Sequence, residues 1–120
     1  MIIEWLNTLC PRLQHLLQIR FQKEYIYNFS FASQATNNSV QMMDRQRSGH
    51  FEPLNPPAVA EVITSVNVGK DDESTLIKMI ESWEKSPQHT NVLRNNNSLG
   101  IGFAYDLGTN VIYTTIRLGK

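Results

Sequence analysis

Two runs of β-forming residues separated by a short turn occupy the carboxyl-terminal fifth of the chain. The runs are LGIGFAYD (residues 99–106) and VIYTTIRLG (residues 111–119), and both are rich in β-branched and aromatic residues. The four residues between them, LGTN, contain the glycine and asparagine that favour a tight turn. The pattern predicts a β-hairpin, so the fold must contain an antiparallel pair of strands at this end of the chain.

Upstream of the hairpin, helical patterns alternate with one further strand. AEVITSVNV (residues 60–68) is rich in valine, isoleucine and threonine and predicts a strand, whereas residues 23–31 fit either an extended segment or a loop over the core. Apolar spacing predicts helices over residues 2–9, 12–24 and 32–46 and another that follows an N-cap at Asp71 or Asp72, and a last helix follows an N-cap at Ser86. Pro11 fits the first turn of the second helix. Together these elements predict an α+β domain with helices packed on a small antiparallel sheet.

Composition limits the class of protein further. The 120 residues suffice for a single domain, residues 1–120, and 41% hydrophobic with 18% charged residues is ordinary for a globular chain. Eleven basic and eleven acidic residues cancel, so no net charge favours binding to nucleic acid or an anionic membrane. Cys10 is the only cysteine, which excludes an intrachain disulfide and a thiolate zinc site. No apolar run approaches the roughly 20 residues that span a bilayer.

The tetrapeptide SPQH (residues 86–89) has the form of a helix start. Ser86 suits the N-cap and Pro87 the first helical position, and a serine before proline is pushed out of the helical region, which ends the preceding helix. We expect an N-cap serine to accept a hydrogen bond from a backbone N–H. His89 has no such local explanation.

The same stretch carries a family resemblance. W-x-x-S-P-x-H, from Trp83 to His89, leads into NVL, then LGIGFAY and VIYTTIRLG, and this order resembles the carboxyl-terminal half of the CAP superfamily. That superfamily comprises the cysteine-rich secretory, antigen 5 and pathogenesis-related 1 proteins, and the resemblance is to its cysteine-poor bacterial branch. FASQATNNSVQMMDRQRSGH resembles the small-residue helix of the family that ends at a histidine, and AEVI stands where the family has a Gly-Glu-Asn strand opening. The resemblance covers residues 31–119 and implies an α-β-α sandwich, while residues 1–30 show no clear family motif.

The resemblance also implies a set of site residues. Relatives with a complete site bring two histidines and two acidic residues together in a cleft that binds a divalent metal such as zinc. By position, His50 and His89 are the histidines and Glu61 is the first acidic residue, while Ser86 stands where the second acidic residue belongs. Glu84 points to another side of its helix and is a poor substitute. The three remaining residues form a ligand set with one open position, which zinc accepts.

Three functions follow as expectations. The first is a binding or signalling module for a small ligand, lipid, glycan or protein, with no assigned catalytic residue. The second is a hydrolase that uses either a metal-bound water with Glu61 as base or a nucleophile pair of Ser86 and His89. The third is a structural or interaction domain with a degenerate site. Fold alone does not choose among them.

The resemblance implies a secreted or cell-envelope protein. MIIEWLNTLC at the start contains Glu4 and no basic segment, so it is a poor match to a secretion signal, and a cytoplasmic location stays open.

Overall fold

The predicted hairpin forms the centre of a four-stranded sheet. The computed structural model describes all 120 residues. Its elements are α1 (Ile2–Phe21), β1 (Ile26–Tyr27), α2 (Phe29–Arg45), β2 (Ala60–Asn67), α3 (Asp72–Glu84), α4 (Pro87–Asn95), β3 (Ser98–Asp106) and β4 (Val111–Gly119). The sheet has the order β1-β3-β4-β2. β3, β4 and β2 are antiparallel, and the two-residue β1 pairs in parallel with β3.

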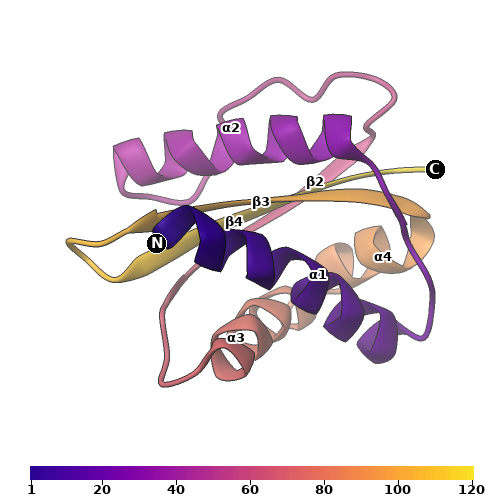
Figure 1. Cartoon of the computed structure of the whole chain (residues 1–120). Helices are drawn as coiled ribbons and strands as arrows, with labels where there is room; N and C mark the ends of the chain where they lie inside the picture. The colour runs from indigo at the N-terminus through magenta and orange to yellow at the C-terminus, as the bar shows by residue number, and fades with distance from the viewer.

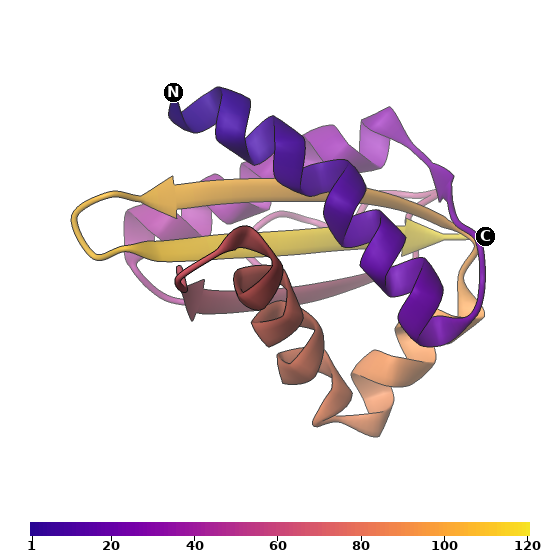
Figure 2. The same ribbon diagram turned by 60° about the horizontal axis from the view of Figure 1, so that its bottom comes forward.

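Helices cover both faces of the sheet and make three layers. α2 lies alone on one face, while α1, α3 and α4 cover the other (Figures 1 and 2). The prediction of an α+β fold, with the α-β-α sandwich that the resemblance implied, is therefore confirmed. No helix has both the length and the apolar character needed to cross a membrane.

The main core lies between the sheet and the three-helix layer. Alternate residues of each strand point into it, such as Leu99 and Ile101 of β3 and Ile116 of β4. Trp83 of α3 is 1% exposed and its indole N–H donates to the carbonyl of Ile63 at 2.9 Å, so its predicted place in the core is confirmed.

The first helix corrects a prediction. Residues 2–9 and 12–24 were expected to form two helices, but α1 runs without interruption from Ile2 to Phe21 with Pro11 inside it. Proline removes one backbone hydrogen bond, and Pro11 lies on the exposed side of the helix. The buried stripe of Leu9, Leu13, Leu17 and Phe21 continues across it at four-residue spacing. Burial of that stripe offsets the cost of the proline.

The second helix packs unusually close to the sheet. Its buried positions include Ala35 and Ser39, as expected for a core helix with small residues on one face. The strand beneath it presents Gly100 and Gly102, and a Cβ on either glycine would lie 2.1 Å from a backbone nitrogen of α2. The glycines of LGIGFAY therefore admit the backbone of a helix, which no side chain at these positions would allow.

Candidate functional site

Two of the predicted site residues, His50 and Glu61, lie in contact. His50 is in the segment between α2 and β2, and Glu61 is the second residue of β2. The imidazole Nδ1 lies 2.5 Å from Oε2 of Glu61. The histidine side chain is 58% exposed, whereas the glutamate side chain is 6% exposed. The structure thus brings an outward-facing imidazole onto a buried carboxylate.

The second oxygen of this carboxylate accepts a hydrogen bond from an arginine that no sequence motif indicated. Nε of Arg117 donates to Oε1 of Glu61 at 2.9 Å, and the arginine is 1% exposed. Both oxygens of Glu61 are therefore engaged, one by a guanidinium and one by an imidazole. The sequence feature that could have indicated Arg117 is its charge within the β-rich run VIYTTIRLG, where alternation places it on one face of the sheet.

Ser86 and His89 are not joined to this pair. Both lie at the amino end of α4, in the layer that covers the opposite face of the sheet from α2 (Figure 1). Nδ1 of His89 is buried and has no hydrogen-bond partner. Nowhere in the structure do three or more histidine, cysteine, aspartate or glutamate side chains form a group that could hold a metal ion. The residues as arranged do not fit a three-ligand zinc site, and zinc binding stays a prediction from resemblance.

The side chain of Ser86 corrects a second expectation. Its backbone has the extended N-cap conformation and Pro87 occupies the first turn, but the hydroxyl makes no capping hydrogen bond. The serine instead contributes its carbonyl, which accepts from the backbone N–H of Thr90 at 3.1 Å and from the threonine hydroxyl at 3.2 Å. Proline geometry is therefore sufficient to start this helix without a side-chain cap.

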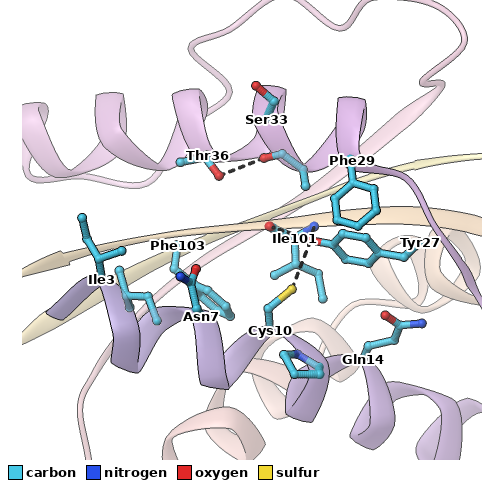
Figure 3. Close-up of a pocket in the computed structure, with 13 residues that line it drawn as sticks. Ile3, Asn7, Cys10, Gln14, Tyr27, Phe29, Ser33, Thr36, Ile101 and Phe103 are labelled. Atoms are coloured by element: carbon cyan, nitrogen blue, oxygen red, sulfur yellow. Dashed lines mark hydrogen bonds between the residues drawn. The ribbon is translucent and has the colours of Figure 1, made fainter. Parts of the chain in front are cut away.

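The largest concave feature of the molecule is a groove that contains none of the predicted site residues. It lies between α1 and α2 and has a volume of about 800 Å³. Figure 3 shows the side chains of both helices and of β3 around it. The lining residues are Ile3, Leu6, Asn7, Cys10, Pro11, Gln14, Tyr27, Phe29, Ala32, Ser33, Thr36, Ile101 and Phe103. None of them is acidic, basic or histidine, so the wall carries no charge at neutral pH.

Cys10 and Tyr27 form the polar floor of this groove. The thiol sulfur lies 3.1 Å from the phenol oxygen (Figure 3). Tyr27 also contacts the backbone of Ile101, donating to its carbonyl at 3.3 Å. Burial raises the pKa of Cys10, and burial together with the Cys10 contact raises the pKa of Tyr27. Both groups therefore stay neutral under physiological conditions.

Sequence reasoning missed the groove because it forms only where α1, α2 and the distant strand β3 meet in the folded chain. α1 supplies one wall, whereas α2 and the β1 segment supply the other. The sequence feature that could have indicated the groove is the aromatic-rich segment KEYIYNFSF (residues 23–31), which contributes Tyr27 and Phe29 to its lining. Phe29 is 81% exposed at the mouth of the groove, and its ring meets that of Tyr27 edge to face at 5.1 Å.

Comparison with solved structures supports the fold. The chain is similar to an outer surface protein from Borrelia burgdorferi, with a TM-score of 0.66 and 11% identity over 98% of this chain and 93% of that one. It is also similar to an extracellular protein containing a SCP domain from Bacillus anthracis str. Ames, with a TM-score of 0.64 and 18% identity. That match covers 95% of this chain and 41% of the other. None of the curated proteins matches the chain.

The family model described as "CAP: Cysteine-rich secretory protein family" matches residues 24–116, well over half of the chain. The match begins just after α1 and takes in the sheet, α2, α3 and α4. It agrees with the resemblance found in the sequence from Trp83 onward. This chain belongs to the CAP family of cysteine-rich secretory proteins.

Proposed function

We propose that this CAP-family chain is a binding module, and that the groove between α1 and α2 holds a small, uncharged, mainly apolar ligand of the lipid class. The observation that carries the proposal is the groove itself, about 800 Å³ in volume and lined by 13 residues of which 8 are hydrophobic. Pockets of this size and composition are typical of small-molecule sites. A charged group inside it would meet no opposite charge and would lose its hydration.

The polar groups of the lining narrow the class of ligand. Gln14 already bonds the carbonyl of Tyr25 at 3.1 Å, and Thr36 donates to the carbonyl of Ala32 at 2.8 Å. The side chains of Asn7 and Ser33 make no hydrogen bond within the protein and remain for a ligand. Two free polar side chains suit an alkyl chain with one alcohol or ester head, whereas a glycan needs many more partners.

A tryptophan at the groove mouth tests the proposal. Ser33 is exposed on α2 and lines the groove, so Ser33→Trp should fill the mouth without disturbing the core. We expect the neutral dye N-phenyl-1-naphthylamine to bind the native chain and to be displaced by a long-chain monoacylglycerol. Ser33→Trp should weaken dye binding by at least about tenfold, which corresponds to about 1.4 kcal/mol.

Asn37→Trp is the matched control. Asn37 is also exposed on the same helix but does not line the groove, so this variant should bind the dye like the native chain. Cys10 adds an independent readout, because bound monoacylglycerol should slow its alkylation by iodoacetamide. Equal dye affinity in the native chain and Ser33→Trp would reject the groove and favour the interaction-only domain.

Hydrolysis has no comparable support in the geometry. No hydrogen bond joins Ser86 to His89, and His50 and Glu61 have no hydroxyl or thiol nucleophile bonded to them. Nucleophilic catalysis requires a nucleophile and a base within hydrogen-bonding reach.

We also propose that the protein works outside the cytoplasm. The two similar structures come from an outer surface protein and an extracellular protein, which supports this location. Immunodetection in culture medium and envelope fractions checks it, and recovery in the cytoplasmic fraction alone would contradict it.

A further inference from the structure

The side chain of Arg117 is a buried cation at the centre of three structural elements. In the register of the sheet, Arg117 on β4 lies opposite Glu61 on β2 and opposite Gly100 on β3. Gly100 faces the backbone of α2, so the arginine shares the face that this helix covers. An arginine buried to this degree requires partners for its charge, because an unpaired buried charge is very costly.

Each nitrogen of the guanidinium has one partner, and the three partners come from different parts of the chain. Nε donates to Oε1 of Glu61 at 2.9 Å, Nη1 to Oε1 of Gln34 at 2.7 Å, and Nη2 to the carbonyl of Glu52 at 2.9 Å. Gln34 belongs to α2, and Glu52 to the segment between α2 and β2. The planar fork of an arginine suits three divergent bonds, which a lysine cannot reproduce.

This arrangement makes Glu61 a poor ligand for a metal ion. Its inner oxygen is held by a permanent positive charge, and its outer oxygen by His50. A zinc ion on this carboxylate would compete with the imidazole for the outer oxygen and would lie close to the guanidinium, where like charges repel.

We propose that Arg117 is the cation that pairs with the carboxylate of Glu61, in place of the zinc ion that the family resemblance assigns to this carboxylate. The native chain then holds no divalent metal at His50 and Glu61. The site instead holds His50 and Glu52, in the segment between α2 and β2, against the sheet. This inference is independent of the groove, which shares no residue with the three partners of Arg117.

Zinc titration of the native protein is the direct test. Isothermal titration calorimetry with zinc chloride should give the same weak or absent heat for the native chain, Glu61→Gln and His50→Ala. Zinc binding at micromolar or tighter affinity that is lost in Glu61→Gln would overturn the proposal.

A double-mutant cycle tests the pairing itself. Arg117→Met and Glu61→Gln should each lower the ratio of folded to unfolded protein by roughly 10²- to 10³-fold, because each leaves the other group buried and unpaired. The double variant should lose far less than the product of the two effects. Arg117→Lys keeps the charge and serves as a matched control with an intermediate loss. Multiplicative losses, or a tolerated Arg117→Met, would contradict the inference.

Nuclear magnetic resonance gives a readout that does not require Arg117→Met to fold. The Nε–H of Arg117 should be protected from exchange with solvent in the native chain, and adding zinc should leave its resonance unchanged. A rapidly exchanging Nε–H, or a zinc-dependent shift of it, would contradict a closed Arg117–Glu61 pair.

Discussion

At the level of single residues, buried polar side chains fix the segment that carries His50. Asn38 of α2 is fully buried, and its amide nitrogen donates to the carbonyl of Gly49 at 3.0 Å. Its oxygen accepts from the backbone N–H of Phe51 at 2.7 Å and of Glu52 at 3.1 Å. One asparagine thus satisfies three backbone groups of an irregular segment, which would otherwise be partly buried without a partner in the protein.

Replacing Asn38 by leucine should therefore be costly. Asn38→Leu leaves these backbone groups unsatisfied, and we expect the free energy of unfolding in urea to fall by about 2–4 kcal/mol. The amide of Phe51 should lose its protection from hydrogen exchange. Asn37→Leu, on the exposed neighbour, should change stability by no more than about 0.5 kcal/mol. Similar small losses in both variants would show that Asn38 does not organise the segment.

Between secondary-structure elements, the fit of α2 against β3 depends on matched spacing. Gly100 meets the backbone at Ala32, and Gly102 meets it at Thr36. Two residues of a strand advance about 6.8 Å and four residues of a helix about 6 Å, so the two glycines repeat in step with one helical turn. The helix consequently approaches the sheet at two successive points.

Adding one methyl group at Gly102 should separate these layers. The atoms that a new Cβ would meet, 2.1 to 2.5 Å away, all belong to the helix backbone and cannot rotate aside. We expect Gly102→Ala to lower the free energy of unfolding by about 3 kcal/mol, measured by urea denaturation. Gly108→Ala is the control, because its Cβ would meet only Oδ1 of Asp106 at 3.3 Å. Equal stability of the two alanine variants would refute close packing at Gly102.

Across the molecule as a whole, the first 27 residues are tied into the fold although they showed no family motif. The buried stripe of α1 belongs to the same core cluster as the strands and α3. Tyr25, just after α1, donates its hydroxyl to the carbonyl of Leu93 in α4 at 2.6 Å. Tyr27 reaches Cys10 on one side and Ile101 on the other. The amino-terminal segment is therefore anchored at both the helical layer and the sheet.

The phenols of Tyr25, which is buried, and Tyr27, which is partly buried, should make the molecule sensitive to alkali. Burial raises the pKa of Tyr25 to about 12 from an ordinary value near 10, and it raises that of Tyr27 as well. Above pH 10 the unfolded chain releases these protons while the folded chain keeps them, so the free energy of unfolding falls as pH rises from 10 towards 12. We expect a loss of roughly 1 kcal/mol per pH unit from Tyr25.

Denaturation in urea at several pH values checks this dependence. Tyr25→Phe should show a shallower slope between pH 10 and 12 than the native chain, although it starts from lower stability because it lacks the bond to Leu93. Below about pH 9, where the phenol of Tyr25 keeps its proton in both the folded and the unfolded chain, the two proteins should show the same slope, which serves as the control. An unchanged slope in Tyr25→Phe would contradict a buried, neutral phenol.

The elements whose signals are local could be predicted from the amino-acid sequence. Alternation and turn chemistry predicted the hairpin and β2, apolar spacing predicted the helices except for the continuity of α1, and SPQH placed the start of α4 at Pro87. The family followed from residues that are contiguous or nearly so in the chain. The pairing of His50 with Glu61 was inferred from the resemblance, since their separation in sequence carries no geometric information.

Features that depend on packing between distant segments emerged only in three dimensions. α1 continues through Pro11 because burial of its apolar stripe in the folded chain outweighs a single lost hydrogen bond. Packing also determines that the Ser86 hydroxyl makes no capping hydrogen bond, that α1 and α2 enclose the groove, and that Arg117 pairs with Glu61. Each outcome depends on which surfaces meet in the folded chain, and the free energy of such contacts cannot be inferred from the local pattern of residues.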